Sequence, residues 1–298
     1  MRLDLPTVLL QWAAGGMLFT WVTTRRRELG IGYGWLLRST YLVLALGALG
    51  AGLTLASGSS DDGAGVRDVG SAGVALGTAL ALGVSVVRRR AGVRGQTAQR
   101  TARRDRVAAM VGREPEPPAA PARRADDGGA ASRAEFPPGL DLLAPAVGLV
   151  GLLGAAQVAG GPYPLALVRL VAGALLLGAV TDAMLLGHWY LVQPGLGREP
   201  IRELIRCAAA VWPVAVVALC WPTGMFQALD GTVDDGWGGI LAWTWVCSAV
   251  STIVLLGVAW LALKEREYSA VMAATGLLYL AILTGAGTDL VARAVLAS

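Results

Sequence analysis

Charge is scarce in this sequence. Only 15% of its 298 residues are charged, whereas 55% are hydrophobic and the mean hydropathy is +0.57. A typical soluble domain carries about 25% charged residues. The shortage of charge therefore excludes an ordinary soluble domain and indicates a chain with a large surface in contact with lipid.

Histidine and cysteine are also scarce. One histidine and three cysteines, with no CxxC pair, disfavour a zinc or iron–sulfur site built from this chain, and a bis-histidine haem would need a second histidine. The nucleotide-binding loop GxxxxGK[ST], the hydrolase elbow GxSxG and the zinc motif HExxH are all missing. These absences favour a protein that is not an enzyme, without deciding the point.

Apolar segments, in contrast, fill most of the chain. A helix needs about 20 mostly apolar residues to cross a hydrocarbon core of roughly 30 Å. Lipid offers no partner to unpaired backbone groups, and these segments lack the two-residue alternation of barrel strands, so we expect helices. The sequence predicts an all-α, polytopic bundle of eight transmembrane helices at 6–23, 36–57, 69–87, 140–159, 164–187, 203–221, 239–262 and 268–289.

Glycine is abundant, with 40 residues, and much of it falls inside the predicted spans. Gly73 and Gly77 form a GxxxG step in the third span. Small residues let helix backbones approach closely where lipid gives no hydrophobic drive. We therefore predict glycine-rich packing between helices.

Basic residues gather on one side of the predicted bundle. Because basic connections stay in the cytoplasm, we predict both termini outside a plasma membrane of bacterial type. The tight connection 160–164 leaves open whether 140–159 and 164–187 both span fully or form a re-entrant pair. With the adjoining helix ends, 21 of the 25 Lys and Arg residues lie in the connections 24–35, 88–139, 188–202 and 263–267.

The segment 88–138 differs from the rest of the chain. It holds twelve arginines and six acidic residues, so its net charge is +6, and Phe136 is its only aromatic residue. Such a composition predicts a disordered cytoplasmic loop between three spans in 1–87 and five in 139–298. Three roles remain open: a solvated anchor, a helix on anionic lipid, or a docking site for a protein partner. Without aromatics for base stacking, we predict no nucleic-acid binding.

Ionisable residues inside a span are costly and are therefore candidates for function. Asp182 and Arg169 lie in the fifth span, 13 residues and about 20 Å apart, too far to pair with each other. Asp289, at the end of the eighth span, is the predicted partner of Arg169. These residues serve either as structural ion pairs or in a path for a ligand or protons.

The string Gly187-His188-Trp189-Tyr190-Leu191-Val192-Gln193-Pro194 contains the only histidine. Histidine can bind haem iron, hydrogen bond to a quinone or shuttle a proton. Trp and Tyr at this depth also fit an ordinary aromatic belt at the membrane surface. If the string forms a polar pocket with nearby charges, its predicted ligand-binding residues are Asp182, His188, Trp189, Tyr190, Gln193, Arg202 and Arg206.

Three functions follow from these patterns. The first is a module that holds a lipophilic ligand, a quinone or lipid or else a haem, near the cytoplasmic interface around His188. The second is a transporter of a small molecule or ion. The third is a non-catalytic scaffold or assembly factor whose basic loop binds a membrane-protein partner. In all three, membrane lipids surround the bundle.

Overall fold

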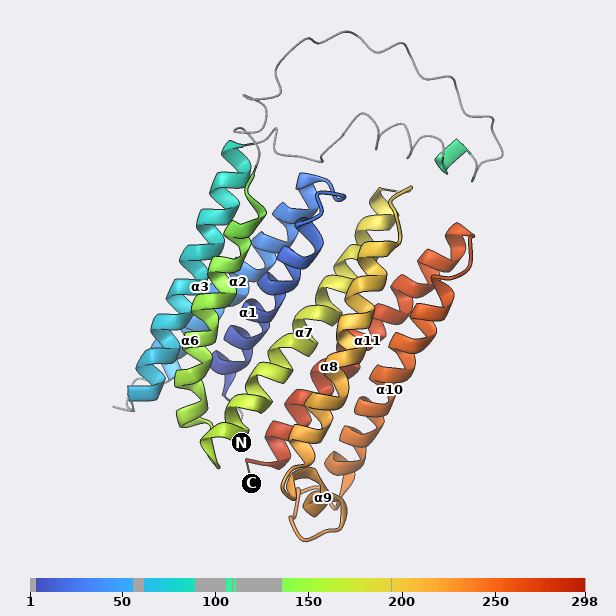
Figure 1. Ribbon diagram of the computed structural model, residues 1–298. Coiled ribbons are helices and arrows are strands. Elements are labelled where there is room, and N and C mark those ends of the chain that lie inside the picture. The colour runs from blue at the N-terminus through green and yellow to red at the C-terminus, as the bar shows by residue number, and fades with distance from the viewer. Residues whose placement is uncertain are drawn as a thin grey trace.

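The computed structural model describes residues 4–55, 62–88, 106–108, 110, 136–193 and 195–297, so most of the predicted disordered loop 88–138 lies outside the described residues. Within these ranges the chain forms helices and no strand, which confirms the all-α prediction. The elements are α1 (Leu5–Thr24), α2 (Ile31–Leu55), α3 (Asp62–Val87), η1 (Pro138–Leu142), α6 (Leu143–Val158), α7 (Tyr163–Val192), α8 (Glu199–Cys220), α9 (Gly224–Leu229), α10 (Ile240–Ala262) and α11 (Tyr268–Val295) (Figure 1).

Eight helices in the described part of the chain, counting η1 together with α6, are long and apolar enough to cross a membrane. The protein is therefore a multi-pass integral membrane protein. Both α6 and α7 run along the length of the bundle (Figure 1), as full spans do and a re-entrant pair does not.

Two helices extend well beyond the predicted apolar segments. α7 continues five residues further, to Val192, and α11 six residues further, to Val295. The added turn of α11 includes Arg293, which is buried. A hydropathy pattern ends at the first polar residues, whereas a helix continues wherever its polar side chains find partners inside the bundle.

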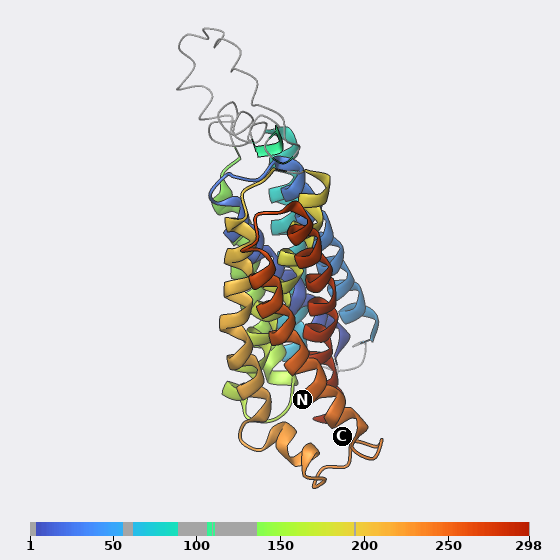
Figure 2. The same ribbon diagram turned by 90° about the vertical axis from the view of Figure 1, so that its right-hand side faces the viewer.

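The eight spans form two groups of four with the same order of packing. In the first half, each of α1, α2, α3 and α6 packs against the next, and α6 packs back against α1. In the second half, α7, α8, α10 and α11 repeat this order. Figure 1 shows the two halves side by side with their helices nearly parallel, and in Figure 2, turned by 90°, the second half lies in front of the first. No internal repeat is evident in the sequence, so this organisation emerges only in three dimensions.

The two halves meet where α1 crosses α7. A Cβ atom added to Gly15 would lie 1.8 Å from the carbonyl oxygen of Ala174, and one added to Gly178 would lie 2.3 Å from the carbonyl carbon of Gly15. Only glycine permits backbones to come this close. Glycine residues thus let α1 and α7 approach closely at the centre of the molecule.

Both termini lie at the same end of the bundle, and the end of α3 and the start of η1 lie at the opposite end (Figure 1). We call these the outer end and the inner end, following the orientation that the charge pattern predicts. Each half begins with its first helix at the outer end, so the two halves run in the same direction.

Candidate functional site

Asp182 places a carboxyl group inside the bundle. Its side chain is fully buried on α7, about 7 Å from the middle of that helix toward the inner end. The Tyr41 hydroxyl of α2 donates a hydrogen bond to its Oδ1, and the Tyr33 hydroxyl donates to the main-chain oxygen of Asp182 at 3.3 Å. The other carboxyl oxygen, Oδ2, is buried and has no hydrogen-bond partner in the described ranges. Because α2 and α7 belong to different halves, this carboxyl lies where the halves meet.

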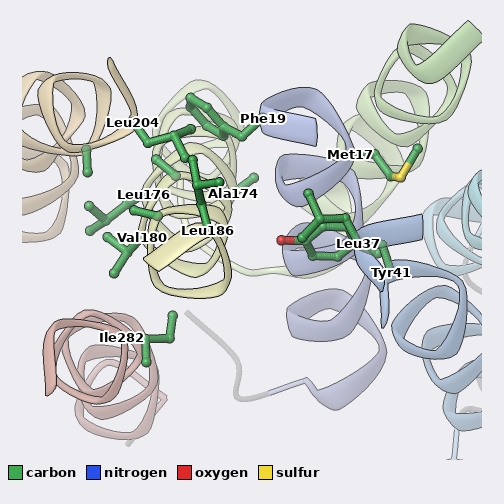
Figure 3. Close-up of a cluster of buried hydrophobic side chains, with 14 of the residues drawn as sticks. Met17, Phe19, Leu37, Tyr41, Ala174, Leu176, Val180, Leu186, Leu204 and Ile282 are labelled. Carbon is green, nitrogen blue, oxygen red and sulfur yellow. The ribbon is translucent and has the colours of Figure 1, made fainter. Parts of the chain in front are cut away.

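A glycine on α1 makes room for Tyr41. A Cβ atom added to Gly16 would lie 2.0 Å from atoms of the Tyr41 ring. The Thr20 hydroxyl, one turn further along α1, donates to the carbonyl oxygen of Gly16 at 3.0 Å and lies beside the Asp182 carboxyl. Figure 3 shows Tyr41 next to Leu37, with its oxygen directed toward the side chains of α7. Residues of α1 and α2 together therefore position the hydroxyl groups that surround Asp182.

The buried cation of α2, Arg38, pairs with a different carboxyl. Its Nε and Nη2 atoms donate to the two carboxyl oxygens of Asp141, each at 2.7 Å. The Thr24 hydroxyl adds a hydrogen bond of 3.1 Å to Asp141, and the guanidinium carbon of Arg38 lies 4.2 Å from the centre of the Phe136 ring. None of the ion pairs found among the described residues includes Asp182. Hydroxyl groups are thus the polar side chains that contact this carboxyl.

The residues around His188 point toward different neighbours. His188 is exposed on α7, and its Nδ1 lies 3.2 Å from the Tyr279 hydroxyl of α11. The next residue, Trp189, packs against the Tyr33 ring of α2, with the ring centres 6.1 Å apart. Consecutive residues of a helix point about 100° apart, which explains why these two face different helices.

The remaining residues of the predicted pocket contact several segments near the inner end. The structure therefore spreads the predicted ligand-binding set over several neighbours and does not gather it around one space. In chain order, the Tyr190 hydroxyl donates to the carbonyl oxygen of Gly197, the Gln193 amide lies beside Gly30, Arg202 donates to the carbonyl oxygen of Leu263, and Arg206 contacts Glu199 and the Trp260 ring.

The sequence predicted that Arg169 and Asp289 pair with each other. In the structure, each of them binds a different partner. Arg169 donates from Nε to the carbonyl oxygen of Ala218 and from Nη2 to that of Trp221, both at 2.8 Å. These bonds satisfy carbonyl groups that the end of α8 leaves unpaired. Asp289 accepts a hydrogen bond of 2.7 Å from Arg293 Nε, one turn along the same helix. A partner four residues away needs no neighbouring helix to bring it close.

Polar contacts join the two halves at both ends of α1. Near the outer end, the buried Gln11 side-chain oxygen accepts a hydrogen bond from Arg293 of α11. At the inner end, Arg25 and Arg26 form ion pairs with Glu203 of α8. Both ends of the seam between the halves are therefore closed in this structure.

Three residues of this seam were not predicted from the sequence: Gln11, Tyr33 and Tyr41. Each is fully buried. A single amide inside an apolar span was a usable signal for Gln11, because a buried amide needs a partner. Tyr33 and Tyr41 offered no such signal, since tyrosine is also common in the aromatic belt.

The chain matches none of the family models, curated proteins and solved structures with which it was compared. Among the described residues, no group of three His, Cys, Asp or Glu side chains is placed to hold a metal ion. We infer a function from the buried Asp182 carboxyl and from the hydroxyl groups around it.

Proposed function

We propose that this protein is a proton-coupled carrier and that Asp182 is its proton-binding group. The observation that supports this is the Asp182 carboxyl, fully buried between two halves, with one oxygen that has no partner in the described ranges. Ionisable groups inside spans often mark proton or substrate pathways. Carriers built from two repeats place such groups near the membrane midplane, where the repeats meet.

The closed seam gives Asp182 a way to couple protons to movement. A charged carboxylate without a cation is far more costly in this packed interior than a neutral carboxylic acid. Loss of the proton therefore favours an arrangement in which the halves part and water reaches Asp182. The contacts Gln11–Arg293 and Arg25–Glu203 close opposite ends of the same seam, so opening one end while the other stays closed gives alternating access.

Infrared difference spectroscopy of the purified protein in lipid discs, with the pH changed stepwise, tests whether Asp182 binds a proton. We expect a pH-dependent carboxylic-acid C=O band in the wild type and its loss in Asp182→Asn. Tyr41→Phe should shift this band and keep it, because one hydrogen bond to the carboxyl is removed.

Asp234→Asn is the matched control for this experiment. Asp234 is exposed in the connection before α10, so the same change of charge there should leave the band unaltered. A band that persists in Asp182→Asn would place the proton site elsewhere and contradict the proposal.

Reconstituted vesicles with a pH-sensitive dye inside test the coupling. Solutes of different chemical classes are added one at a time, and the proton movement that accompanies uptake is recorded. For a transported solute, we expect Asp182→Asn to abolish this proton movement, because an amide does not take up and release the proton. A solute that moves with protons equally well in wild type and variant would contradict the role of Asp182.

The orientation is part of the same proposal. We place the inner end, with loop 88–138, in the cytoplasm and both termini outside, because most basic residues lie at the inner connections. Single cysteines introduced into the exposed connection at Asp234 should react with a membrane-impermeant reagent added to whole cells. Labelling only after the cells are broken would show that this connection lies in the cytoplasm, which is the opposite orientation.

One contact favours a second candidate function, the binding of a lipophilic ligand at His188. When the Tyr279 hydroxyl donates to Nδ1, the neutral ring carries its own proton on Nε2, and this donor lies on the exposed surface of α7. A quinone carbonyl or a lipid ester oxygen would accept that hydrogen bond. The ligand would then approach from the membrane, outside the seam that holds Asp182.

This candidate is tested by the absorption spectrum and the extractable lipids of the gently purified protein. It predicts stoichiometric quinone that His188→Ala removes and that Asp182→Asn leaves in place. A wild-type protein that carries only bulk lipid would eliminate the quinone form of this candidate.

A further inference from the structure

A small cavity lies at the inner end, where α1 ends and α2 begins. Its volume is about 40 Å³, roughly three times the space that one water molecule requires. Thr24, Arg27 and Arg38 supply its polar side chains, and Phe136 and Pro138, which lead into η1, form part of its wall. The cavity therefore has room for a compact polar group among residues of three neighbouring segments.

Arg38 offers a hydrogen-bond donor to this cavity. Only 2% of its side chain is exposed, and Asp141 accepts hydrogen bonds from its Nε and Nη2 atoms. The third nitrogen, Nη1, forms no hydrogen bond with any residue that the structure describes. Buried N–H groups nearly always have an acceptor. We therefore expect the acceptor of Nη1 to come from outside these residues.

The absence of a side chain at Gly34 leaves room beside this nitrogen. A Cβ atom added to Gly34 would lie 2.6 Å from Arg38 Nη1, and Gly34 is itself part of the cavity wall. The Phe136 ring covers one face of the guanidinium group, with the ring centre 4.2 Å from the guanidinium carbon. Asp141 and Phe136 thus fix the orientation of Arg38, with Nη1 at the cavity.

The start of α2 adds main-chain donors to the same cavity. α2 begins at Ile31, and both Gly30 and Ile31 are part of the wall. The first N–H groups of a helix have no acceptor inside that helix and carry the positive end of its dipole. Anions bind at such helix starts. The helix start and the Arg38 side chain are therefore two independent features that favour an anion here.

The charged residues that line the cavity are both arginines, Arg27 and Arg38. Among the described lining residues there is no acidic side chain, since Asp141 pairs with Arg38 from outside the wall. Arginine presents several N–H groups in one plane, which matches the oxygen atoms of a phosphate group. The cavity thus combines the charge and the donors that a phosphate group requires.

We propose that this cavity binds a phosphate group. Arg38 Nη1 and the Arg27 guanidinium donate hydrogen bonds to its oxygens, together with main-chain N–H groups at the start of α2. The phosphate belongs either to the headgroup of a membrane lipid or to free inorganic phosphate, because both present the same oxygens. Once bound, it joins the connection between α1 and α2 to the segment that leads into η1. This inference does not depend on the role of Asp182.

The experiment uses the full-length protein in a maltoside detergent and a phosphate-free buffer, after bound lipid has been removed. Inorganic phosphate and dihexanoyl phosphatidic acid, a short-chain lipid, are titrated separately while thermal unfolding is recorded. A ligand that binds the folded state raises the unfolding temperature, and the concentration dependence gives its affinity. Tighter binding of the lipid identifies a headgroup as the source, and equal affinities identify free phosphate. Dihexanoyl glycerol, which lacks phosphate, should cause no such rise.

Two variants test the site. Gly34→Ala places a methyl group beside the Nη1 donor, and Arg27→Gln removes one cation, so each should weaken the binding of both probes by about tenfold or more. Gly50→Ala is the matched control on α2, because nothing lies within 4 Å of the added Cβ atom. Arg26→Gln is the control for charge, since Arg26 pairs with Glu203 and is not part of the cavity wall. Both controls should bind as the wild type does.

Three results would overturn the site. They are the absence of binding of both probes to the wild type, equal affinities in wild type, Gly34→Ala and Arg27→Gln, and an equal effect of dihexanoyl glycerol. If Gly34→Ala does not fold, Arg27→Gln in the connection after α1 decides the result. Asp182→Asn should bind both probes as the wild type does, so loss of the phosphate site would leave the proposed function in place.

Discussion

The buried ion pair between Arg38 and Asp141 contributes to the stability of the fold, and its contribution can be measured. Both side chains are almost fully buried and share two hydrogen bonds of 2.7 Å. Removing one partner leaves the other charge buried and uncompensated, which typically costs about 3–5 kcal/mol. Asp141→Asn should therefore destabilise the protein strongly, as measured by thermal unfolding in detergent.

The exposed ion pair between Arg206 and Glu199 is the matched control. Both of its side chains are about half exposed, and exposed pairs contribute about 0–1 kcal/mol. Glu199→Gln should barely change the unfolding temperature. Equal effects of Asp141→Asn and Glu199→Gln would show that water reaches the Arg38 pair, contrary to its burial.

At the scale of one element, Asp235 organises the start of α10. Its Oδ1 accepts hydrogen bonds from the backbone N–H groups of Gly239 and Trp237, and its Oδ2 from those of Leu241 and Ala242. The bond from Gly239, with the other three, lowers the pKa of the Asp235 carboxyl. A carboxyl with a lowered folded-state pKa stabilises the structure above its unfolded pKa and loses this effect as the pH falls through the folded value.

Hydrogen exchange of residues 237–242, read by mass spectrometry, should follow this dependence. We expect protection at neutral pH and its loss only below the ordinary pKa range of aspartate, near 3.9. Asp235→Asn keeps one acceptor oxygen, so it should lose the bonds from Leu241 and Ala242 at every pH. Asp234→Asn, which affects a single backbone bond to Gly236, should leave residues 239–242 protected. Unchanged protection in Asp235→Asn would refute this account.

At the scale of the whole molecule, the crossing of α1 and α7 holds the halves together. A Cβ atom on Gly178 would meet the backbone of Gly15 at 2.3 Å, and backbone cannot move aside as a side chain can. Gly178→Ala should therefore destabilise the protein by about 1–3 kcal/mol. Gly276→Ala, with open space around it on α11, should be neutral or should stabilise by about 0.5–1 kcal/mol. Similar unfolding temperatures for the two variants would mean that the halves do not meet at this crossing.

More of the fold than of the candidate site could be predicted from the sequence. Runs of apolar residues determine where helices span, since lipid permits little else. Asp182 was also identifiable, because a charge in an apolar run is conspicuous. Its partner Tyr41 lies 141 residues earlier on another helix, and no periodicity links two such positions. Arg293 lies beyond the predicted eighth span at 268–289, so the sequence did not point to it as the partner of Asp289.

The equal packing order of the halves has a consequence for how the molecule can be divided. Each unit of four spans is contiguous in the chain and packs within itself, and the short connection between α6 and α7 is the covalent link between the two units. Co-expressed fragments 1–160 and 161–298 should therefore associate one to one in the membrane. Fragments that purify separately would show that the covalent link is needed to hold the halves together.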